Sequence, residues 1–429
     1  MRRAMCRAGA AKVVVVGGTG RVGSACAARL AGAGLCGPPV LAGRRPQGFA
    51  EALAEGEGED APAPGGGRGA RARVLREAGA TFEAVDLDGG PGGLLAALRG
   101  ADLAVHCAGP FPRRPACDVL EACLAAGVPY VDVCDDLAYA RRAKGLARKA
   151  ADLGIPAVTG AGLHPGLSSV MARAMIEAVR EGEGAAAAGE GEAPVTPTSL
   201  RFNYFTAGSG GVGPAALATS VLRCADDAVA IKDGERLAVR PASNREVIDF
   251  GTGVGKREVF LYNLPEVTTC QELYDVPTVT ARCGTSPGVY NGALQLVARL
   301  PRLLLESREF AGGLAQLALA PVRATDGLVG ETASVRVDVE FSNKTVQSGV
   351  FVHAHAAAAA GAAAAGFCRA VLNGETAPGV WFPEEEGAVE DVAGFLEFAR
   401  EGADRLDLCQ PPWKVDSNAT QLGMGLYWE

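Results

Sequence analysis

The sequence predicts an α/β protein in which a doubly wound parallel sheet is followed by a second, α+β domain with a mixed or antiparallel sheet. Three observations lead to this expectation. Short apolar runs alternate with helix-like segments over about the first 160 residues, the pattern changes after Ser199, and 429 residues exceed what one hydrophobic core usually holds. We therefore expect a first domain at 1–164, a central domain at 165–352 and a C-terminal helical segment at 353–429.

The elements of the first domain follow from short runs of β-branched and other apolar residues. The run at 12–16 leads into a glycine-rich turn, and apolar residues then recur at helical spacing from Arg21 to Ala31. Later strands are expected at 39–42, 82–85, 103–106, 128–133 and 155–159, with helix-like segments such as 94–98 and 117–126 between them. Strands that alternate with helices at this spacing form βαβ units and hence a parallel sheet.

The second domain is expected from a different pattern. A strand at 200–206 and an alternating pair at 335–341 and 346–352, the latter joined by a hairpin-like connection, indicate a mostly antiparallel sheet. An alanine-rich helix at 356–372 follows.

Two segments of low complexity interrupt these patterns. Residues 55–72 and 181–194 consist largely of Gly, Glu, Ala and Pro and offer little to bury. We expect both to be flexible surface insertions without a functional role.

Composition and charge narrow the class of partner. The net charge of −8 argues against nucleic acid, which is bound by clustered Lys and Arg, and favours a small-molecule substrate. The longest apolar stretch is mostly Ala and Gly and contains Arg369, so no transmembrane segment is expected. Twelve cysteines without a CxxC pair and four dispersed histidines predict no metal site and an intracellular, soluble protein. The sequence leaves open whether the protein forms a homodimer.

A glycine-rich run carries the strongest functional signal. The run GGTGRVG at 17–23 has the GxGxxG spacing, with a strand before it and a helix after it. Backbone N–H groups and the positive end of the helix then face a pyrophosphate, as in a Rossmann-type dinucleotide-binding domain. The strand at 12–16 should be central, because the pyrophosphate crevice opens where the strand order reverses. The expected pyrophosphate contacts are Gly18, Thr19, Gly20, Arg21 and Val22.

The end of the second expected strand bears on the choice of cofactor. An enzyme that uses NAD usually places Asp or Glu here, whereas this sequence has Gly43, Arg44 and Arg45. A guanidinium suits a 2′-phosphate, so Arg44 favours NADP, with NAD as the alternative. The plainer interpretation of Arg44 is a solvated surface residue.

Loops after later strands complete the expected cofactor site. Asp86 follows the third strand and is a candidate contact on the adenine side. Ala108, Gly109 and Pro110 follow the fourth strand and would pass over the nicotinamide half.

With these residues in place, the chain resembles the saccharopine dehydrogenase-like family, in particular its plant and algal members. The matching pieces span nearly the whole chain: VVVVGGTGRVG at 13–23, VHCAGPF at 105–111, YVDVCDD at 130–136, GLHPGLSSVMA at 162–172 and PGVWFPEE at 378–385. The resemblance implies a Rossmann domain, a central α+β domain, and a C-terminal segment that returns toward the first domain. It also implies a plastid location, with the cytoplasm as the alternative.

The same resemblance implies NAD(P)-dependent redox chemistry on a C=N, C=C or C=O bond, but it does not identify the substrate. A saccharopine enzyme should gather several arginines for three carboxylates, and the sequence offers only Arg113, Arg114 and Arg201 as candidates.

Candidates for proton transfer lie beyond the expected strand ends, where ligands of doubly wound sheets bind. Asp135 is the first choice and His164 the second, because a carboxylate or imidazole there could move the proton that accompanies a hydride. Two plainer interpretations remain. Asp135 or Asp136 could cap the following helix, and His164 could make a structural hydrogen bond beside Pro165.

Two functions of different classes follow. The first is an NADP(H)-dependent oxidoreductase that transfers hydride to or from an unidentified small molecule. The alternative is a cofactor-binding protein without turnover, a redox sensor or assembly factor, because no complete catalytic set is recognisable.

Overall fold

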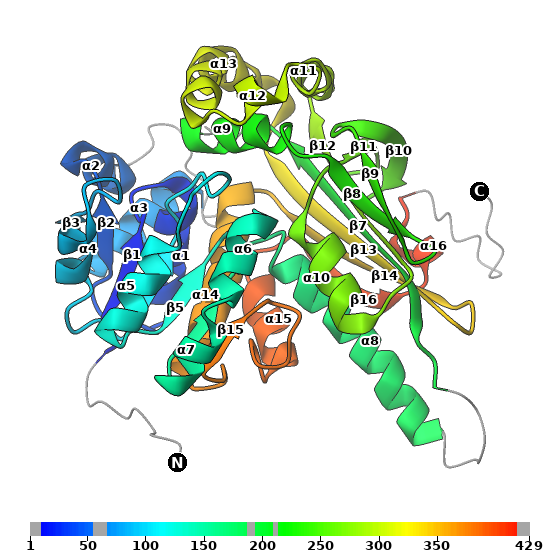
Figure 1. Cartoon of the computed structure of the whole chain (residues 1–429), viewed down its shortest axis with the longest axis horizontal. Helices are drawn as coiled ribbons and strands as arrows, with labels where there is room; N and C mark the ends of the chain where they lie inside the picture. The colour runs from blue at the N-terminus through cyan, green and yellow to red at the C-terminus, as the bar shows by residue number, and fades with distance from the viewer. Residues whose placement is uncertain (1–9, 55–66, 187–193, 209–212, 418–429) are drawn as a thin grey trace. The chain divides into compact units, whose positions relative to one another are not determined.

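The computed structural model describes residues 10–54, 67–186, 194–208 and 213–417, except for the side chains of 183–186 and 326–328. The chain divides into two compact units (Figure 1). The first consists of Met1–Leu167 and Ala357–Gly402, and the second of Ser168–Ala356 and Ala403–Glu429. Each unit is described by itself below.

A parallel sheet forms the centre of the first unit. Its strand order in the described residues is β15-β6-β5-β4-β1-β2-β3, and all neighbouring pairs are parallel. The strands are β1 (Val13–Val16), β2 (Val40–Gly43), β3 (Thr81–Ala84), β4 (Leu103–His106), β5 (Tyr130–Asp132), β6 (Pro156–Val158) and β15 (Gly379–Trp381). This confirms the predicted fold class. Strand β1 lies between β4 and β2, where the order reverses, so it has the predicted central position, and its four valines are buried.

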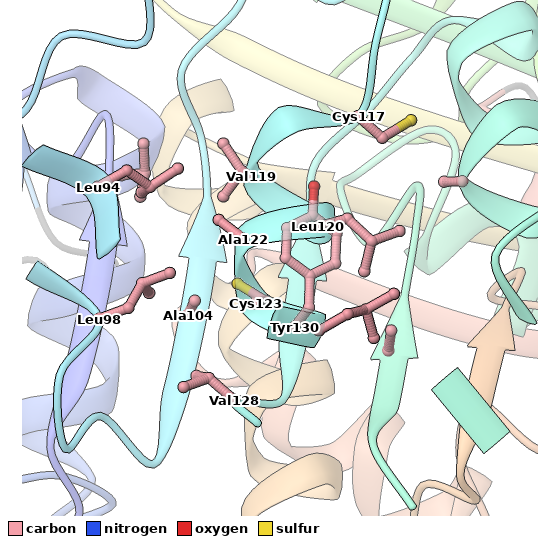
Figure 2. Packing of buried hydrophobic residues seen from close by; sticks show 14 of the residues in the cluster. Leu94, Leu98, Ala104, Cys117, Val119, Leu120, Ala122, Cys123, Val128 and Tyr130 are labelled. Carbon is pink, nitrogen blue, oxygen red and sulfur yellow. The ribbon is translucent and has the colours of Figure 1, made fainter. Parts of the chain in front are cut away.

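Helices accompany these strands in the order that a doubly wound sheet requires. They are α1 (Arg21–Gly32), α2 (Pro46–Leu53), α3 (Arg68–Glu77), α4 (Pro91–Ala97), α5 (Asp118–Ala126), α6 (Leu137–Lys144), α7 (Ala147–Asp152), α14 (Ala356–Leu372) and α15 (Val392–Arg400). Figure 2 shows side chains of α4 and α5 gathered with Ala104 of β4 and Tyr130 of β5 in the core of this unit. This packing fixes the carboxyl ends of β4 and β5, from which the candidate loops extend.

A mixed sheet forms the second unit. Its main path within the described residues is β10-β11-β12-β7-β13-β14-β16, and β8 pairs with β12 and with β9. The strands are β7 (Pro197–Ala207), β8 (Ala228–Lys232), β9 (Glu235–Val239), β10 (Ser243–Asp249), β11 (Lys256–Leu261), β12 (Thr278–Ser286), β13 (Thr332–Phe341), β14 (Val346–His353) and β16 (Arg405–Gln410). Strand β7 pairs in parallel with β12 and antiparallel with β13, so the sheet is mixed.

The helices of the second unit include the longest ones among the described residues. They are α8 (Leu167–Ala186), α9 (Pro214–Arg223), α10 (Pro265–Tyr274), α11 (Val289–Val297), α12 (Arg302–Leu305), α13 (Arg308–Val329) and α16 (Pro412–Val415). No helix in the described ranges is long and apolar enough to cross a membrane.

The structure differs from the expected organisation at three places. Helix α3 begins at Arg68, inside the expected insertion at 55–72, because Ala72 and Leu75 are buried. Helix α8 continues to Ala186, inside the expected insertion at 181–194. Part of the C-terminal segment belongs to the second unit, since β16 pairs with β14. The remaining residues of both insertions, 55–66 and 187–193, lie outside the described residues.

Candidate functional site

The glycine-rich turn after β1 leaves no room for side chains. A Cβ atom at Gly17, where φ is +79°, would lie 2.6 Å from the Ala108 nitrogen. At Gly18 it would lie 2.7 Å from the Val15 oxygen, and at Gly23 it would lie 2.4 Å from the Gly17 oxygen. Real Cβ atoms do not approach backbone atoms this closely, so glycine is required at these three positions. The contact with Ala108 also brings the loops after β1 and β4 together.

The start of helix α1 is open to an anion. Gly20 is the N-cap and has no capping side chain, and the first turn contains no acidic residue. Arg21 and Val22 occupy that first turn, so their positions fit the predicted pyrophosphate contacts. The guanidinium of Arg71 in α3 donates to the Arg21 carbonyl oxygen at 3.1 Å. The sequence missed this cation because it lies in the segment expected to be an insertion.

The end of β2 presents two exposed arginines. Neither the Arg44 nor the Arg45 guanidinium makes an ion pair or hydrogen bond with another described residue. Thr19 lies against Gly43 and Gly48, where a Cβ atom at Gly43 would be 3.0 Å from the Thr19 Oγ1 atom. The Gly-rich turn and the end of β2 are therefore adjacent, as a site that binds both the phosphates and the adenosine ribose requires.

Asp86 occupies an exposed loop after β3. Its Oδ1 atom accepts a hydrogen bond from the Asp88 N–H group at 3.2 Å, which forms a local turn. This contact leaves the carboxylate exposed, so Asp86 stays a candidate contact on the adenine side.

A buried polar network that the sequence did not predict joins the end of β4 to β5 and α6. His106 Nδ1 lies 3.0 Å from the Tyr130 hydroxyl, which lies 3.4 Å from the Tyr139 hydroxyl. Burial lowers the pKa of His106 to about 3, helped by the Arg114 charge, so the imidazole is neutral near pH 7. The expected nicotinamide contacts Ala108, Gly109 and Pro110 follow His106 directly, and the Gly109–Pro110 peptide is cis. The network thus supports the base of the predicted nicotinamide loop.

Asp132, at the end of β5, joins the loops that carry the two predicted proton-transfer residues. Its Oδ1 atom accepts hydrogen bonds from the N–H groups of Cys134 at 2.9 Å and Gly160 at 2.8 Å, and from the Thr159 hydroxyl at 3.1 Å. Its backbone oxygen accepts from the Ala161 N–H group at 2.7 Å. Burial raises the pKa of the Asp132 carboxyl to about 6, against the opposing effect of these hydrogen bonds.

The structure assigns helix capping to Asp136 rather than to Asp135. The Asp136 Oδ1 atom accepts a hydrogen bond from the Tyr139 N–H group at 2.7 Å at the start of α6. Asp135 is half-buried in the same loop. Capping therefore accounts for one of the two adjacent aspartates and does not account for Asp135.

His164 lies in a rigid loop between β6 and α8. The Gly162 N–H group donates to the Pro165 oxygen, and the Leu167 N–H group donates to the Gly162 oxygen, both at 3.0 Å. A Cβ atom at Gly166, where φ is +130°, would lie 1.9 Å from the Gly162 oxygen. The His164–Pro165 peptide is cis, and the imidazole is half-buried. Backbone contacts thus hold His164 in one position.

Two cysteines near this site have little thiolate character. Cys134 is buried, and its Sγ atom lies 3.4 Å from the Asp136 oxygen. Burial raises the pKa of both the Cys107 and the Cys134 thiols. Neither thiol has the electropositive surroundings of a reactive cysteine.

The second unit holds a buried carboxyl that sequence reasoning also missed. The Glu266 Oε1 atom accepts hydrogen bonds from the Tyr204 hydroxyl at 2.6 Å and from the Ser168 hydroxyl at 3.3 Å. Burial raises the pKa of Glu266. No motif surrounds this residue, and only the packing of α8, β7 and α10 brings the three side chains together.

Comparison with known proteins agrees with this geometry. Residues 13–158 match the model of the saccharopine dehydrogenase NADP binding domain. Apo saccharopine dehydrogenase (L-Glu forming) from Saccharomyces cerevisiae is similar in structure, with a TM-score of 0.60 and 12% identity over 93% of this chain and 100% of that one. At this identity the likeness concerns the fold alone.

More distant structures include a myo-inositol dehydrogenase from Corynebacterium glutamicum, with 13% identity, a TM-score of 0.38 and coverage of 94% of this chain and 99% of that chain. A search of curated proteins finds no significant match. The chain therefore has an NAD(P)-binding, saccharopine dehydrogenase-like fold, and its residues 13–158 match the saccharopine dehydrogenase NADP binding domain.

Proposed function

We propose that the protein is an NADP(H)-dependent oxidoreductase that transfers hydride to or from a C=N, C=C or C=O bond of a small molecule. One observation carries the proposal. The glycine turn that excludes side chains and the uncapped start of α1 match the pyrophosphate of NADP, and the exposed arginines after β2 match its 2′-phosphate.

The preference for NADP over NAD rests on Arg44 and Arg45. No acidic residue stands at the end of β2 to accept hydrogen bonds from a ribose 2′-hydroxyl, and the two guanidinium groups supply positive charge for a 2′-phosphate. A guanidinium donates in a fork that suits phosphate oxygens, so Arg44 is the residue that we propose for this contact.

The bound nicotinamide would supply or accept the hydride. The chain must then supply or accept a proton, and the loops after β5 and β6 hold the groups that we propose for it. Asp135 is half-buried and is not the cap of α6, and His164 is held by its loop. Asp132 fixes both loops through its hydrogen bonds and acts as a positioning residue.

The experiment is a turnover assay with a panel of imines, enoyl compounds and keto acids. Purified protein is mixed with NADPH, and absorbance at the reduced nicotinamide band is followed for each compound. Oxidation of NADPH that depends on one compound class supports the proposal. Tight NADPH binding without turnover on the whole panel would instead favour a redox sensor or assembly factor.

A further inference from the structure

Helix α3, which the sequence did not predict, is joined to both helices that border the proposed cofactor site. The Arg71 guanidinium donates to the carbonyl oxygen of Arg21, in the first turn of α1, at 3.1 Å. A second arginine of α3, Arg76, donates to the Leu53 oxygen at the end of α2. Helix α3 also packs against α1 and α2. The start of α3 therefore lies close to the start of α1.

The starts of α1, α2 and α3 lie toward the same edge of the parallel sheet. In a βαβ unit a helix begins after the carboxyl end of one strand and leads back to the amino end of the next. Helix α1 leads from β1 to β2, and α2 and α3 together lead from β2 to β3. Because these three strands are parallel, the three helix starts lie toward their carboxyl ends, as the glycine turn and Arg44 do.

All three helix starts are uncapped and carry arginine. The N-cap residues that make no capping side-chain hydrogen bond are Gly20, Arg45 and Gly67. The first turns of these three helices contain no acidic residue, whereas Arg21 stands in that of α1, and Arg68 and Arg71 stand among the first four residues of α3. Arginine at the positive end of a helix is unfavourable. A bound anion would reverse the sign of this effect, so the arrangement fits an anion at this edge.

The pyrophosphate of the cofactor accounts for only one of the three helix starts. It is expected at the N–H groups that begin α1. Helix α2 follows β2 directly, and α3 packs against α2, so their starts lie on the β2 side of the glycine turn. The adenosine ribose binds on this side in a Rossmann-type domain. The anion that distinguishes NADP from NAD there is the 2′-phosphate.

We propose that Arg71 is a second specificity-determining residue for NADP(H) and that it contacts the 2′-phosphate together with Arg44. This inference rests on the proposed function. The hydrogen bond to the Arg21 oxygen fixes where the Arg71 guanidinium lies. A guanidinium donates through five N–H groups in a planar fork that matches phosphate oxygens. Helix α3 thus adds to the cofactor site a cation that the glycine motif does not indicate.

The test compares four nucleotides by isothermal titration calorimetry at one ionic strength. NADPH and adenosine 2′,5′-bisphosphate carry the 2′-phosphate, and NADH and 5′-AMP lack it. The proteins are the wild type, Arg71→Gln and the control Arg73→Gln. Arg73 is an exposed arginine of the same helix, 3.9 Å from the Glu77 carboxylate, so the control removes the same charge from α3.

We expect Arg71→Gln to raise the Kd for the two nucleotides with a 2′-phosphate about 10-fold or more, the scale of a lost charged hydrogen bond. Its Kd for NADH and 5′-AMP should stay within about 2-fold of the wild type, and Arg73→Gln should match the wild type for all four. Circular dichroism and melting curves check that the variants are folded. If Arg71→Gln does not fold, Arg71→Lys replaces it, because lysine keeps the charge and lacks the fork, and the loss for NADPH should be about 3-fold or more.

An equal loss for nucleotides with and without the 2′-phosphate would overturn the proposal and make Arg71 a structural residue of α3. A wild type that prefers the 2′-phosphate nucleotides, with Arg71→Gln equal to the control, would overturn this inference alone. A wild type that binds none of the four nucleotides would overturn the proposed function as well.

Discussion

The Asp132 carboxylate accepts a hydrogen bond from the Gly160 N–H group at 2.8 Å and thereby joins the ends of β5 and β6. The same Oδ1 atom also binds the N–H group of Cys134. The loops that carry Asp135 and His164 are thus anchored to one buried atom, and the position of both candidates depends on a residue that need not touch substrate.

The raised pKa of Asp132 predicts a pH dependence of stability. An aspartate that titrates near pH 4 when unfolded and near pH 6 when folded favours the folded state in its protonated form. The stabilising contribution of protonated Asp132 to the free energy of unfolding is roughly 2 to 3 kcal/mol. It is fully present below about pH 4 and is lost as the pH rises to about 6. Asp132→Asn keeps an acceptor at Oδ1 and cannot ionise. The difference in denaturation midpoint between Asp132→Asn and the wild type should therefore increase in favour of the variant as the pH rises from about 4 to about 7. A difference that does not change with pH would contradict this prediction.

Removal of the Asp132 side chain, and with it the hydrogen-bond acceptor, should destabilise the folded state. Asp132→Ala leaves the N–H groups of Cys134 and Gly160 buried without a partner, which should lower the free energy of unfolding by about 2 to 5 kcal/mol at pH 5. Urea denaturation measures this loss. If Asp132→Ala is as stable as Asp132→Asn, the hydrogen bonds do not hold the two loops.

The glycine turn predicts a sharp contrast between two alanine substitutions. Gly18→Ala would place a Cβ atom 2.7 Å from the Val15 oxygen and 2.9 Å from the Leu41 Cα atom, so the turn must shift and NADPH affinity should fall at least about 10-fold. Gly69→Ala in α3 meets nothing within 4 Å and should leave affinity unchanged, with stability equal or up to about 1 kcal/mol higher. Isothermal titration calorimetry separates the two. Equal affinity of both variants would show that the turn does not bind the cofactor.

The proposed proton-transfer residues predict a loss of rate without a loss of cofactor. On a substrate found with the panel, Asp135→Asn and His164→Ala should each lower kcat, while the Kd for NADPH stays nearly the same. Asp152→Asn, an exposed position on α7, is the matched control for the charge change. Full activity in both test variants would make Asp135 and His164 structural residues.

Much of the first unit was predictable because its signals are local. Strand β4 and helix α14 have the predicted bounds, and β1 was recognisable from four valines before a glycine turn. Helix α3 was missed because only Ala72 and Leu75 are buried in a stretch of Arg, Gly and Ala that otherwise indicates a surface insertion. Strand β16 joins β14 across about fifty residues, and such pairing leaves no local pattern.

The site was predictable where a motif demands a conformation and unpredictable where packing decides. Gly18 and Gly23 follow from GxGxxG, since backbone atoms fill the space of a Cβ. The sequence left the cap of α6 open between Asp135 and Asp136, and only the hydrogen bond to Tyr139 assigns it to Asp136. The His106, Tyr130 and Tyr139 network needs three separate elements to meet, so no local sequence pattern indicates it.

Arg44 carries the proposed preference for NADP. Arg44→Asp should weaken NADPH binding by about 2 to 3 kcal/mol, the scale of a lost charged hydrogen bond, and spare NADH. Arg148→Asp, at another exposed arginine of the first unit on α7, should change neither affinity. An equal loss for both nucleotides in Arg44→Asp would place Arg44 away from the 2′-phosphate.

The affinities of the unmodified protein for NADPH and NADH, measured by isothermal titration calorimetry at one ionic strength, test the proposed function and cofactor preference together. We predict that NADPH binds at least about 10-fold more tightly than NADH, because Arg44 meets a 2′-phosphate that NADH lacks. Equal affinities would contradict the preference for NADP, and the absence of binding to either nucleotide would contradict the proposed function as a whole.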